Sequence, residues 1–182
     1  MGRCFILAPS MITRQQAEKL IEERIPGTRK GSDEPAYKHS LRVAETVEKF
    51  SYAEPVIISA ILHDVVEDGG VTYEELEKLG CTEEIIELVT LCTHDDMIES
   101  NEARWIDMMT GLVHAYNPDA WAIKIADAWD NMKGAETMNP DSRRFFRQAK
   151  TPMLAAISHE LMKDTAIWKG YWEDVKIYRD RV

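Results

Sequence analysis

Apolar residues recur at helical spacing along nearly the whole chain, and the polar residues between them supply helix start and stop signals. Thr13 and Gln16 have the spacing of a capping box that opens a first helix, and Pro26-Gly27 ends it. The polar residues that follow predict a loop. Pro35 then fits the first turn of a second helix, which we expect to run to about Phe50.

The next segment predicts three further helices in close succession. An apolar run from Pro55 to about Asp68 predicts the third helix, which Gly69-Gly70 ends. Thr72 begins a second capping-box pattern and a short helix. Thr82, followed by two glutamates that complement the helix dipole, begins the next one.

The second half of the chain continues this helical pattern. Residues 94–101 are polar and predict a loop, followed by helices near 102–115 and 119–133. The last 40 or so residues predict a further helix pair, broken near Pro152. No run of residues alternates between apolar and polar side chains, with hairpin turns, as β-strands do. We therefore expect an all-α fold, a helical bundle that forms a single domain over residues 1–182.

An apolar stripe marks the C-terminal helix. It recurs at i, i+3 and i+4 spacing, which favours core or dimer packing over a ligand cage. Its members are Trp168, Tyr171, Trp172, Val175 and Tyr178.

The charge restricts the possible partners. With 22 basic and 32 acidic residues the formal net charge is −10, which disfavours nucleic acids and anionic membranes. No apolar run reaches the length of a membrane span, and residues 5–8 are too few for a signal-peptide core. We therefore expect a cytoplasmic protein. The scattered Cys4, Cys81 and Cys92 indicate neither a disulfide framework nor a zinc site.

Candidate chemistry concentrates at the end of the third predicted helix. On an ideal helical wheel His63, Asp64, Glu67 and Asp68 share the side opposite the apolar stripe. Asp64 and Asp68 repel each other at i,i+4, and acids at a helix C-terminus oppose the dipole. A bound divalent cation would reverse both penalties. The alternative is a solvated acidic face.

Two distant residues complete a possible metal site, and each also has a purely structural interpretation. His39 lies on an apolar stripe and could be a hydrogen-bonded core histidine. Asp127 lies in an apolar helix, where Lys124 at i−3 could neutralise it. If the four residues His39, His63, Asp64 and Asp127 converge, they form an N2O2 set that suits Mn²⁺, Fe²⁺ or a similar ion.

These residues resemble a known family. A first His, a later His-Asp pair and a distant Asp are the signature of the HD superfamily. The local sequences are similar to the hydrolase domain of RelA/SpoT proteins: Arg29-Lys30, residues 35–39 (PAYKH), residues 61–68 (ILHDVVED) and residues 124–133 (KIADAWDNMK). Ala128 and Asp130 depart from that pattern. The resemblance covers about residues 14–140, and the chain looks like a stand-alone small alarmone hydrolase.

The resemblance implies a metal-dependent (p)ppGpp 3′-pyrophosphohydrolase that takes a small anionic nucleotide. Glu67 and Asp68 would orient or deprotonate the attacking water, and Glu67 is the expected base because its wheel position lies between His63 and Asp64. Arg29, Lys30 and Asn131 would bind the substrate, although a charged loop and a structural hydrogen bond explain them equally well. Two alternatives stay open: a phosphatase of the same fold acting on another nucleotide or NADPH, and a non-catalytic nucleotide-binding module.

Overall fold

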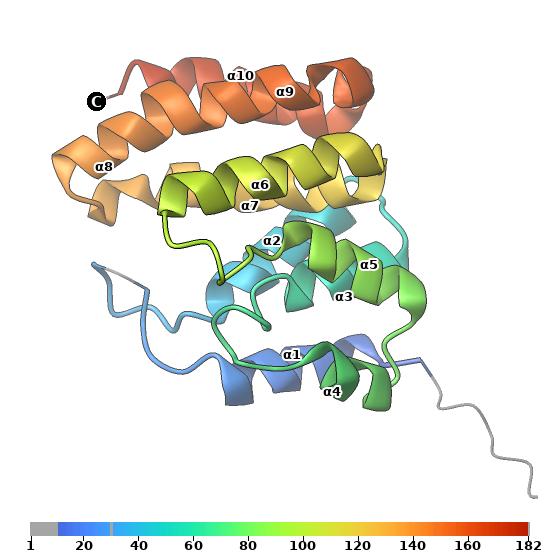
Figure 1. Cartoon of the computed structure of the whole chain (residues 1–182). Coiled ribbons are helices and arrows are strands. Elements are labelled where there is room, and N and C mark those ends of the chain that lie inside the picture. The colour runs from blue at the N-terminus through green and yellow to red at the C-terminus, as the bar shows by residue number, and fades with distance from the viewer. Residues whose placement is uncertain (1–10, 30, 182) are drawn as a thin grey trace, which may run out of the picture.

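The chain folds as a helical bundle (Figure 1). The computed structural model describes residues 11–29 and 31–181, and within these ranges no strand forms apart from the isolated bridge between Thr28 and Pro35. The α-helices are α1 Arg14–Arg24, α2 Lys38–Lys49, α3 Glu54–Leu62, α4 Tyr73–Lys78, α5 Glu83–Cys92, α6 Asn101–Ala115, α7 Pro118–Gly134, α8 Pro140–Phe145, α9 Thr151–Met162 and α10 Ala166–Arg179. A 3₁₀ turn at Ala135–Thr137 and a π-helical turn at Phe146–Lys150 complete the helical elements.

Two helices form the centre of the bundle. Every residue from Val56 to Leu62 in α3 is buried, and α3 packs against α1, α2, α5 and α7. Residues 120–129 of α7 are likewise all buried, and α7 packs against α2, α5, α9 and α10. Figure 1 shows α1 and α4 at one end of the molecule and α9 and α10 at the other. Asp127 and Asn131 therefore lie on one of the two central helices, and His63 and Asp64 follow directly after the other.

The expected helix starts at three threonines are confirmed. Thr13 and Thr72 each form a complete capping box with the residue three positions later. The Thr82 side chain accepts a hydrogen bond from the backbone N–H of Ile85. These bonds satisfy backbone donors that a helix start would otherwise leave without partners.

Two predicted boundaries near the site were wrong. The third helix ends at Leu62, and the chain runs from His63 to Gly69 in hydrogen-bonded turns. This bend requires glycine at position 69, because an added Cβ would lie 2.6 Å from the carbonyl oxygen of Val65. The second helix begins at Lys38 rather than at Pro35, because the Ala36 amide bonds to the carbonyl of Gly27 at 3.0 Å and holds this segment against the preceding loop.

The expected break near Pro152 was also misplaced. Helical structure continues from Pro140 to Met162, and the chain turns at residues 163–165 instead. Pro152 follows directly after the π-helical turn, which accommodates its ring and its missing N–H within the continuous helical segment.

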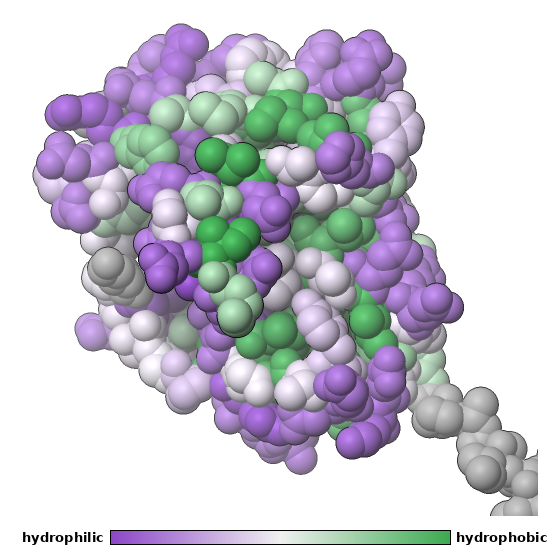
Figure 2. Space-filling model, viewed as in Figure 1, coloured by the Kyte–Doolittle hydropathy of each residue, from purple (hydrophilic) through white to green (hydrophobic). Residues whose placement is uncertain are grey.

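The C-terminal stripe packs into the core as expected. Trp168, Tyr171 and Val175 are buried, and the Tyr171 hydroxyl donates to the carbonyl of Thr151 at 3.0 Å. The face shown in Figure 2 is largely hydrophilic, with smaller apolar areas between the charged side chains. Within the part of the chain that the structure describes, no helix combines the length and apolar character needed to span a bilayer.

Candidate active site

His63 follows directly after α3 and is almost completely buried, with 1% of its surface exposed. Its Nδ1 lies 2.8 Å from the carbonyl oxygen of Ala60, so Nδ1 carries the proton and donates it. Its Nε2 is buried without a hydrogen-bond partner among the described residues. A buried nitrogen left in this state is costly unless something else binds it.

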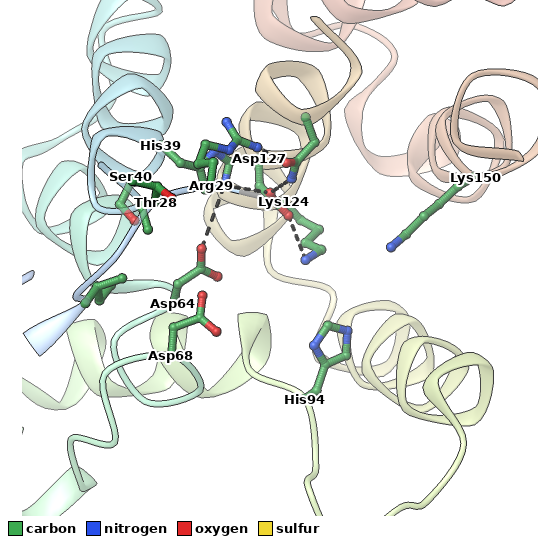
Figure 3. Close-up of a pocket in the computed structure, with 13 residues that line it drawn as sticks. Thr28, Arg29, His39, Ser40, Asp64, Asp68, His94, Lys124, Asp127 and Lys150 are labelled. Atoms are coloured by element: carbon green, nitrogen blue, oxygen red, sulfur yellow. Dashed lines mark hydrogen bonds and ion pairs between the residues drawn. The ribbon is translucent and has the colours of Figure 1, made fainter. Parts of the chain in front are cut away.

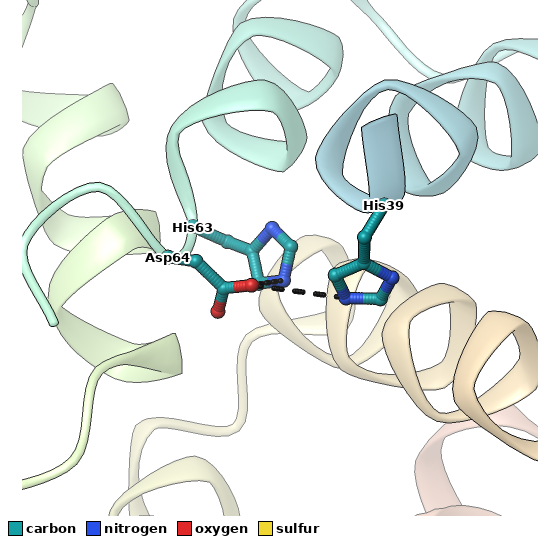
Figure 4. Close-up of side chains that lie close together, drawn as sticks. All are labelled: His39, His63 and Asp64. Atoms are coloured by element: carbon teal, nitrogen blue, oxygen red, sulfur yellow. Dashed lines mark ion pairs between the residues drawn. The ribbon is translucent and has the colours of Figure 1, made fainter. Parts of the chain in front are cut away.

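His39 lies in the first turn of α2 and faces the same point from the other side (Figure 4). The centroids of the two imidazole rings are 5.3 Å apart. His39 Nδ1 lies 2.7 Å from Asp130 Oδ2, while Nε2 lies 3.1 Å from Asp127 Oδ1 and 3.7 Å from Asp64 Oδ2. Each ring is thus held through Nδ1, and each presents Nε2 to the shared space.

The chemistry of this donor set fits a metal ion. His39, His63 and Asp64 each bring one ligand atom to within 4.8 Å of the others. Asp64 Oδ2 lies 3.1 Å from His63 Nε2. When His63 is neutral and donates through Nδ1, these two atoms are both acceptors, and a cation between them removes the repulsion. Imidazole held by a second hydrogen bond is the usual form of a metal-binding histidine.

The neighbouring carboxylates raise the pKa values of both histidines. Burial lowers the pKa of His39, but hydrogen bonds to Asp127 and Asp130 outweigh it and raise this pKa to about 9. Burial also lowers the pKa of His63, and the charge of Asp64 reverses this effect and raises it. The site therefore attracts positive charge strongly.

Asp127 is buried in α7 and has several partners. Lys124 Nζ lies 2.8 Å from Oδ2, and Oδ1 accepts from Asn131 and faces His39 Nε2. Burial raises the pKa of Asp127, but the charge of Lys124 reverses this and holds it well below its usual range. This ion pair confirms the expectation that Lys124 can neutralise Asp127. Asp127 Oδ1 nevertheless points toward the same space as the three converging ligands.

Sequence reasoning missed the role of Asp130. Its carboxylate bonds His39 Nδ1, and it also pairs with Arg29 at 2.8 Å and with Arg42 at 2.7 Å. It lies one helical turn after Asp127, so the same face of α7 carries both carboxylates. The spacing was visible in the sequence, but its partners come from distant elements.

The two predicted catalytic acids occupy different positions. Asp68 lines a cavity of about 360 Å³ beside the histidines, and burial, followed by the charges of Asp64 and Glu67, raises its pKa. Glu67 is not among the residues that line this cavity. Its Oε1 accepts from the backbone N–H of His94 and lies 2.9 Å from His94 Nδ1. Both roles stay predictions.

The cavity collects residues from most of the central elements (Figure 3). Carboxylates of the candidate metal site line it together with basic side chains from the loop before α2, from α7 and from the π-helical turn, and apolar and uncharged polar residues complete the lining. Its lining is Ile25, Thr28, Arg29, Ala36, His39, Ser40, Asp64, Asp68, His94, Lys124, Asp127, Asn131 and Lys150. His94, Lys124 and Lys150 were not predicted as site residues. Lys150 comes from the distant C-terminal third, which gives no motif from which to find it.

The predicted substrate-binding residues are partly brought together. Arg29 and Asn131 both line the cavity, and Arg29 donates to the Asn131 side-chain oxygen. Lys30 lies outside the described residues, as do Cys4 and the short apolar run at residues 5–8. Cys81 and Cys92 are buried free thiols.

Comparisons with known proteins show the family to which the chain is similar. Residues 15–151 match the model of the HD domain family. A probable GTP pyrophosphokinase of Mycobacterium leprae is 26% identical over 158 residues, which are 85% of this chain and 20% of that protein. The bifunctional (p)ppGpp synthase/hydrolase SpoT of Escherichia coli is 26% identical over 151 residues, 81% of this chain and 21% of that protein. The chain spans about a fifth of the length of these curated relatives.

A solved structure shares the fold. A metazoan ortholog of SpoT, described as hydrolysing ppGpp, superposes with a TM-score of 0.75 at 21% identity. The match covers 92% of this chain and 96% of that one. The family match spans the candidate ligands from α2 to α7, and the chain belongs to the HD domain family.

Proposed function

We propose that this chain is a divalent-metal-dependent hydrolase that removes the 3′-pyrophosphate from (p)ppGpp and releases pyrophosphate. The observation that carries the proposal is the buried, unpartnered Nε2 of His63 beside His39 and Asp64, at the edge of a cavity with basic side chains. The relatives named for (p)ppGpp chemistry, together with the motifs in the chain, support the choice of substrate.

We assign the metal to His39, His63, Asp64 and Asp127, with Mn²⁺ or Fe²⁺ as the expected ion. When bound, the ion would supply a Lewis acid that polarises a phosphoryl oxygen and makes a water more acidic. The chain itself does the rest. Asp130 and the Ala60 carbonyl hold the two imidazoles in the tautomer that presents Nε2.

The cavity resolves a conflict between the overall charge and an anionic substrate. The formal net charge of −10 repels such a substrate at long range. Arg29, Lys124 and Lys150 place three cationic side chains around the cavity. At short range these cations can bind phosphate oxygens, Arg29 through its planar guanidinium and the lysines as point charges.

Asp68 is the acid best placed to take a proton from the attacking water. It lines the cavity, and burial with the neighbouring negative charges of Asp64 and Glu67 raises its pKa toward that of a useful base. Glu67, in the same turn, remains a predicted catalytic carboxylate that would orient or deprotonate the water. Arg29 and Asn131 are the predicted substrate contacts that the structure describes.

A second function is favoured by one observation. Arg29 is already paired with Asp130 at 2.8 Å and bonded to Asn131, so its charge is less available to a distal phosphate. Asp130 is also a position where the chain departs from the RelA/SpoT pattern. Release of orthophosphate from another nucleotide or from NADPH is therefore the competing activity.

One assay separates these functions. Purified protein loaded with Mn²⁺ is given ppGpp, a panel of nucleoside monophosphates and NADPH, and the phosphorus product is identified by ³¹P NMR. Pyrophosphate from ppGpp supports the proposal, and orthophosphate from another compound supports the second function. The Asp64→Ala protein and an EDTA-treated sample are the controls. No turnover of any compound, with nucleotide binding retained, would leave a non-catalytic binding module.

The cytoplasmic location expected from the sequence stays a prediction.

A further inference from the structure

His94 occupies a fixed position at the mouth of the candidate site. It follows Thr93, the C-cap residue of α5, whose hydroxyl donates to the carbonyl of Val89 at 2.9 Å. Its side chain lines the cavity, and in Figure 3 it lies below Lys150 and across from Asp68. A quarter of its side-chain surface is exposed, so a bound molecule can reach it.

Glu67 holds this imidazole in one orientation. A single carboxylate oxygen, Oε1, accepts from the His94 backbone N–H and lies 2.9 Å from its Nδ1. The Nδ1–Oε1 contact is an ion-pair distance, and because an ionised carboxylate can only accept, it favours the tautomer with the proton on Nδ1. The other nitrogen, Nε2, has no hydrogen-bond partner among the described residues. A histidine oriented by a carboxylate through one nitrogen and open through the other is the arrangement of a proton-transfer residue.

Two of the other basic side chains of the cavity are less suited to give up a proton, whereas burial and the charge of Lys124 lower the pKa of a third, Lys150. Lys124 is held by Asp127 at 2.8 Å, and Arg29 is held by Asp130. Arginine does not lose its proton in proteins. The charge of Glu67 beside Nδ1 compensates the positive charge of a protonated ring. A protonated His94 ring can therefore present its Nε2 proton to the cavity.

We propose that His94 is the general acid of the phosphohydrolase reaction and that Glu67 is the positioning residue that orients it. This inference rests on the proposed function. The water oxygen bonds to phosphorus while the bond from phosphorus to the leaving oxygen breaks. One water proton passes to Asp68, and the Nε2 proton of His94 passes to the leaving oxygen. For ppGpp the products are pyrophosphate and a free 3′-hydroxyl, and exchange with solvent restores both residues.

The charged groups that face His94 determine how the pH dependence is interpreted. Glu67 contacts the ring directly, and Asp95 and Asp96 follow it in the same loop. The remaining charged groups around the cavity are Arg29, His39, Asp64, Asp68, Lys124, Asp127 and Lys150. A pH profile of the wild type alone cannot be assigned to one of them, so the test compares variants.

The test uses His94→Gln in the Mn²⁺-loaded full chain with ppGpp as substrate. Glutamine keeps the volume and a donor for Glu67 but cannot titrate. We expect kcat to fall by about 10²–10⁴-fold, the usual share of general acid–base catalysis. The loss of wild-type activity with rising pH should also disappear, while bound Mn²⁺ and KM change little. His114→Gln, an exposed histidine of α6, is the matched control and should leave activity unchanged.

A double mutant tests the pair. If Glu67 acts through His94, the Glu67→Gln/His94→Gln protein should be no slower than the slower single variant. Losses that multiply would show that Glu67 handles the water independently and would overturn its positioning role. Near wild-type kcat in His94→Gln, or an unchanged basic limb of its pH profile, would overturn the role of His94.

A measurement without turnover separates this inference from the proposed function. ¹⁵N NMR of the neutral His94 ring should show the proton on Nδ1 in the wild type, and Glu67→Ala should abolish this preference. A proton on Nε2 in the wild type would overturn the pairing. If wild-type protein releases no pyrophosphate from ppGpp, the proposed function fails, and the variants are compared on whichever phosphate ester of the panel is hydrolysed.

Discussion

Asp130 Oδ2 lies 2.7 Å from Nδ1 of His39, and this contact joins α7 to the first turn of α2 behind the candidate metal site. The same carboxylate pairs with Arg29 and Arg42. It therefore fixes the His39 ring from the side opposite Nε2, which faces Asp127 Oδ1 at 3.1 Å. Burial raises the pKa of Asp130, but its bonds to His39 and Arg42 reverse this and hold the pKa well below the usual range, so Asp130 stays ionised.

Replacing Asp130 with Asn should weaken metal binding without removing a ligand. The amide keeps the shape but loses the charge that orients and polarises His39. Loss of such a partner typically costs about 10–100-fold in metal affinity or activity. Mn²⁺ affinity measured by calorimetry, with turnover measured alongside, checks this. Unchanged values for both would show that Asp130 serves only its ion pairs with the arginines.

The ligand assignment predicts stoichiometric metal. Protein reconstituted with Mn²⁺ or Fe²⁺ should contain about one ion per chain. Asp64→Ala should lose both the metal and activity, because it removes a carboxylate from a site with two neutral imidazoles. Elemental analysis after desalting provides the measurement. Wild-type protein without stoichiometric metal would refute the site.

Chelation should destabilise the folded protein. Asp64, Glu67 and Asp68 repel one another in one short turn, and a cation bound to the folded state stabilises it by linkage. At a metal concentration 100 times Kd the gain is about 2.7 kcal/mol. For a chain of this size that corresponds to roughly 2–4 °C in Tm for each kcal/mol. Thermal unfolding with EDTA and after Mn²⁺ addition tests it. Confirmed metal loss with an unchanged Tm contradicts the prediction.

Asp68→Asn should separate stability from catalysis. The pKa of Asp68 is raised in the folded protein, so ionisation of this carboxylate disfavours folding. The penalty is fully present above the folded-state pKa and vanishes below the ordinary value of 3.8. The metal-free variant should therefore unfold at a higher temperature than wild type at neutral pH, and this difference should disappear as the pH falls below that value.

The same variant should be a poor enzyme. If Asp68 takes the proton from water, kcat should fall by about 10²–10⁴-fold while Mn²⁺ remains bound. Matched melting curves at neutral and acidic pH, together with metal analysis and turnover, give the complete test. A variant that is less stable than wild type at neutral pH would contradict the predicted cost of ionising Asp68. A fully active variant would contradict its role as the base.

Local sequence determined most of the helices. Thr13, Thr72 and Thr82 begin helices where the capping pattern placed them, because those hydrogen bonds form within four residues. Boundaries shaped by contacts with distant segments were less predictable. The third predicted helix ended before His63, and the bend that follows lies against α1, where an added Cβ at Gly69 would be 3.3 Å from the Cβ of Arg24.

The sequence by itself identified the residue types of the site, their order and the family pattern to which they belong. Tertiary structure decided which atoms meet. Its contacts join segments that lie far apart in the chain. His39 meets His63 and Asp64, and Asp130 supports His39. Lys150 and His94 line the same cavity. Helical periodicity assigns a residue to a face of its own helix, but the packing of α2, α3 and α7 determines what that face meets.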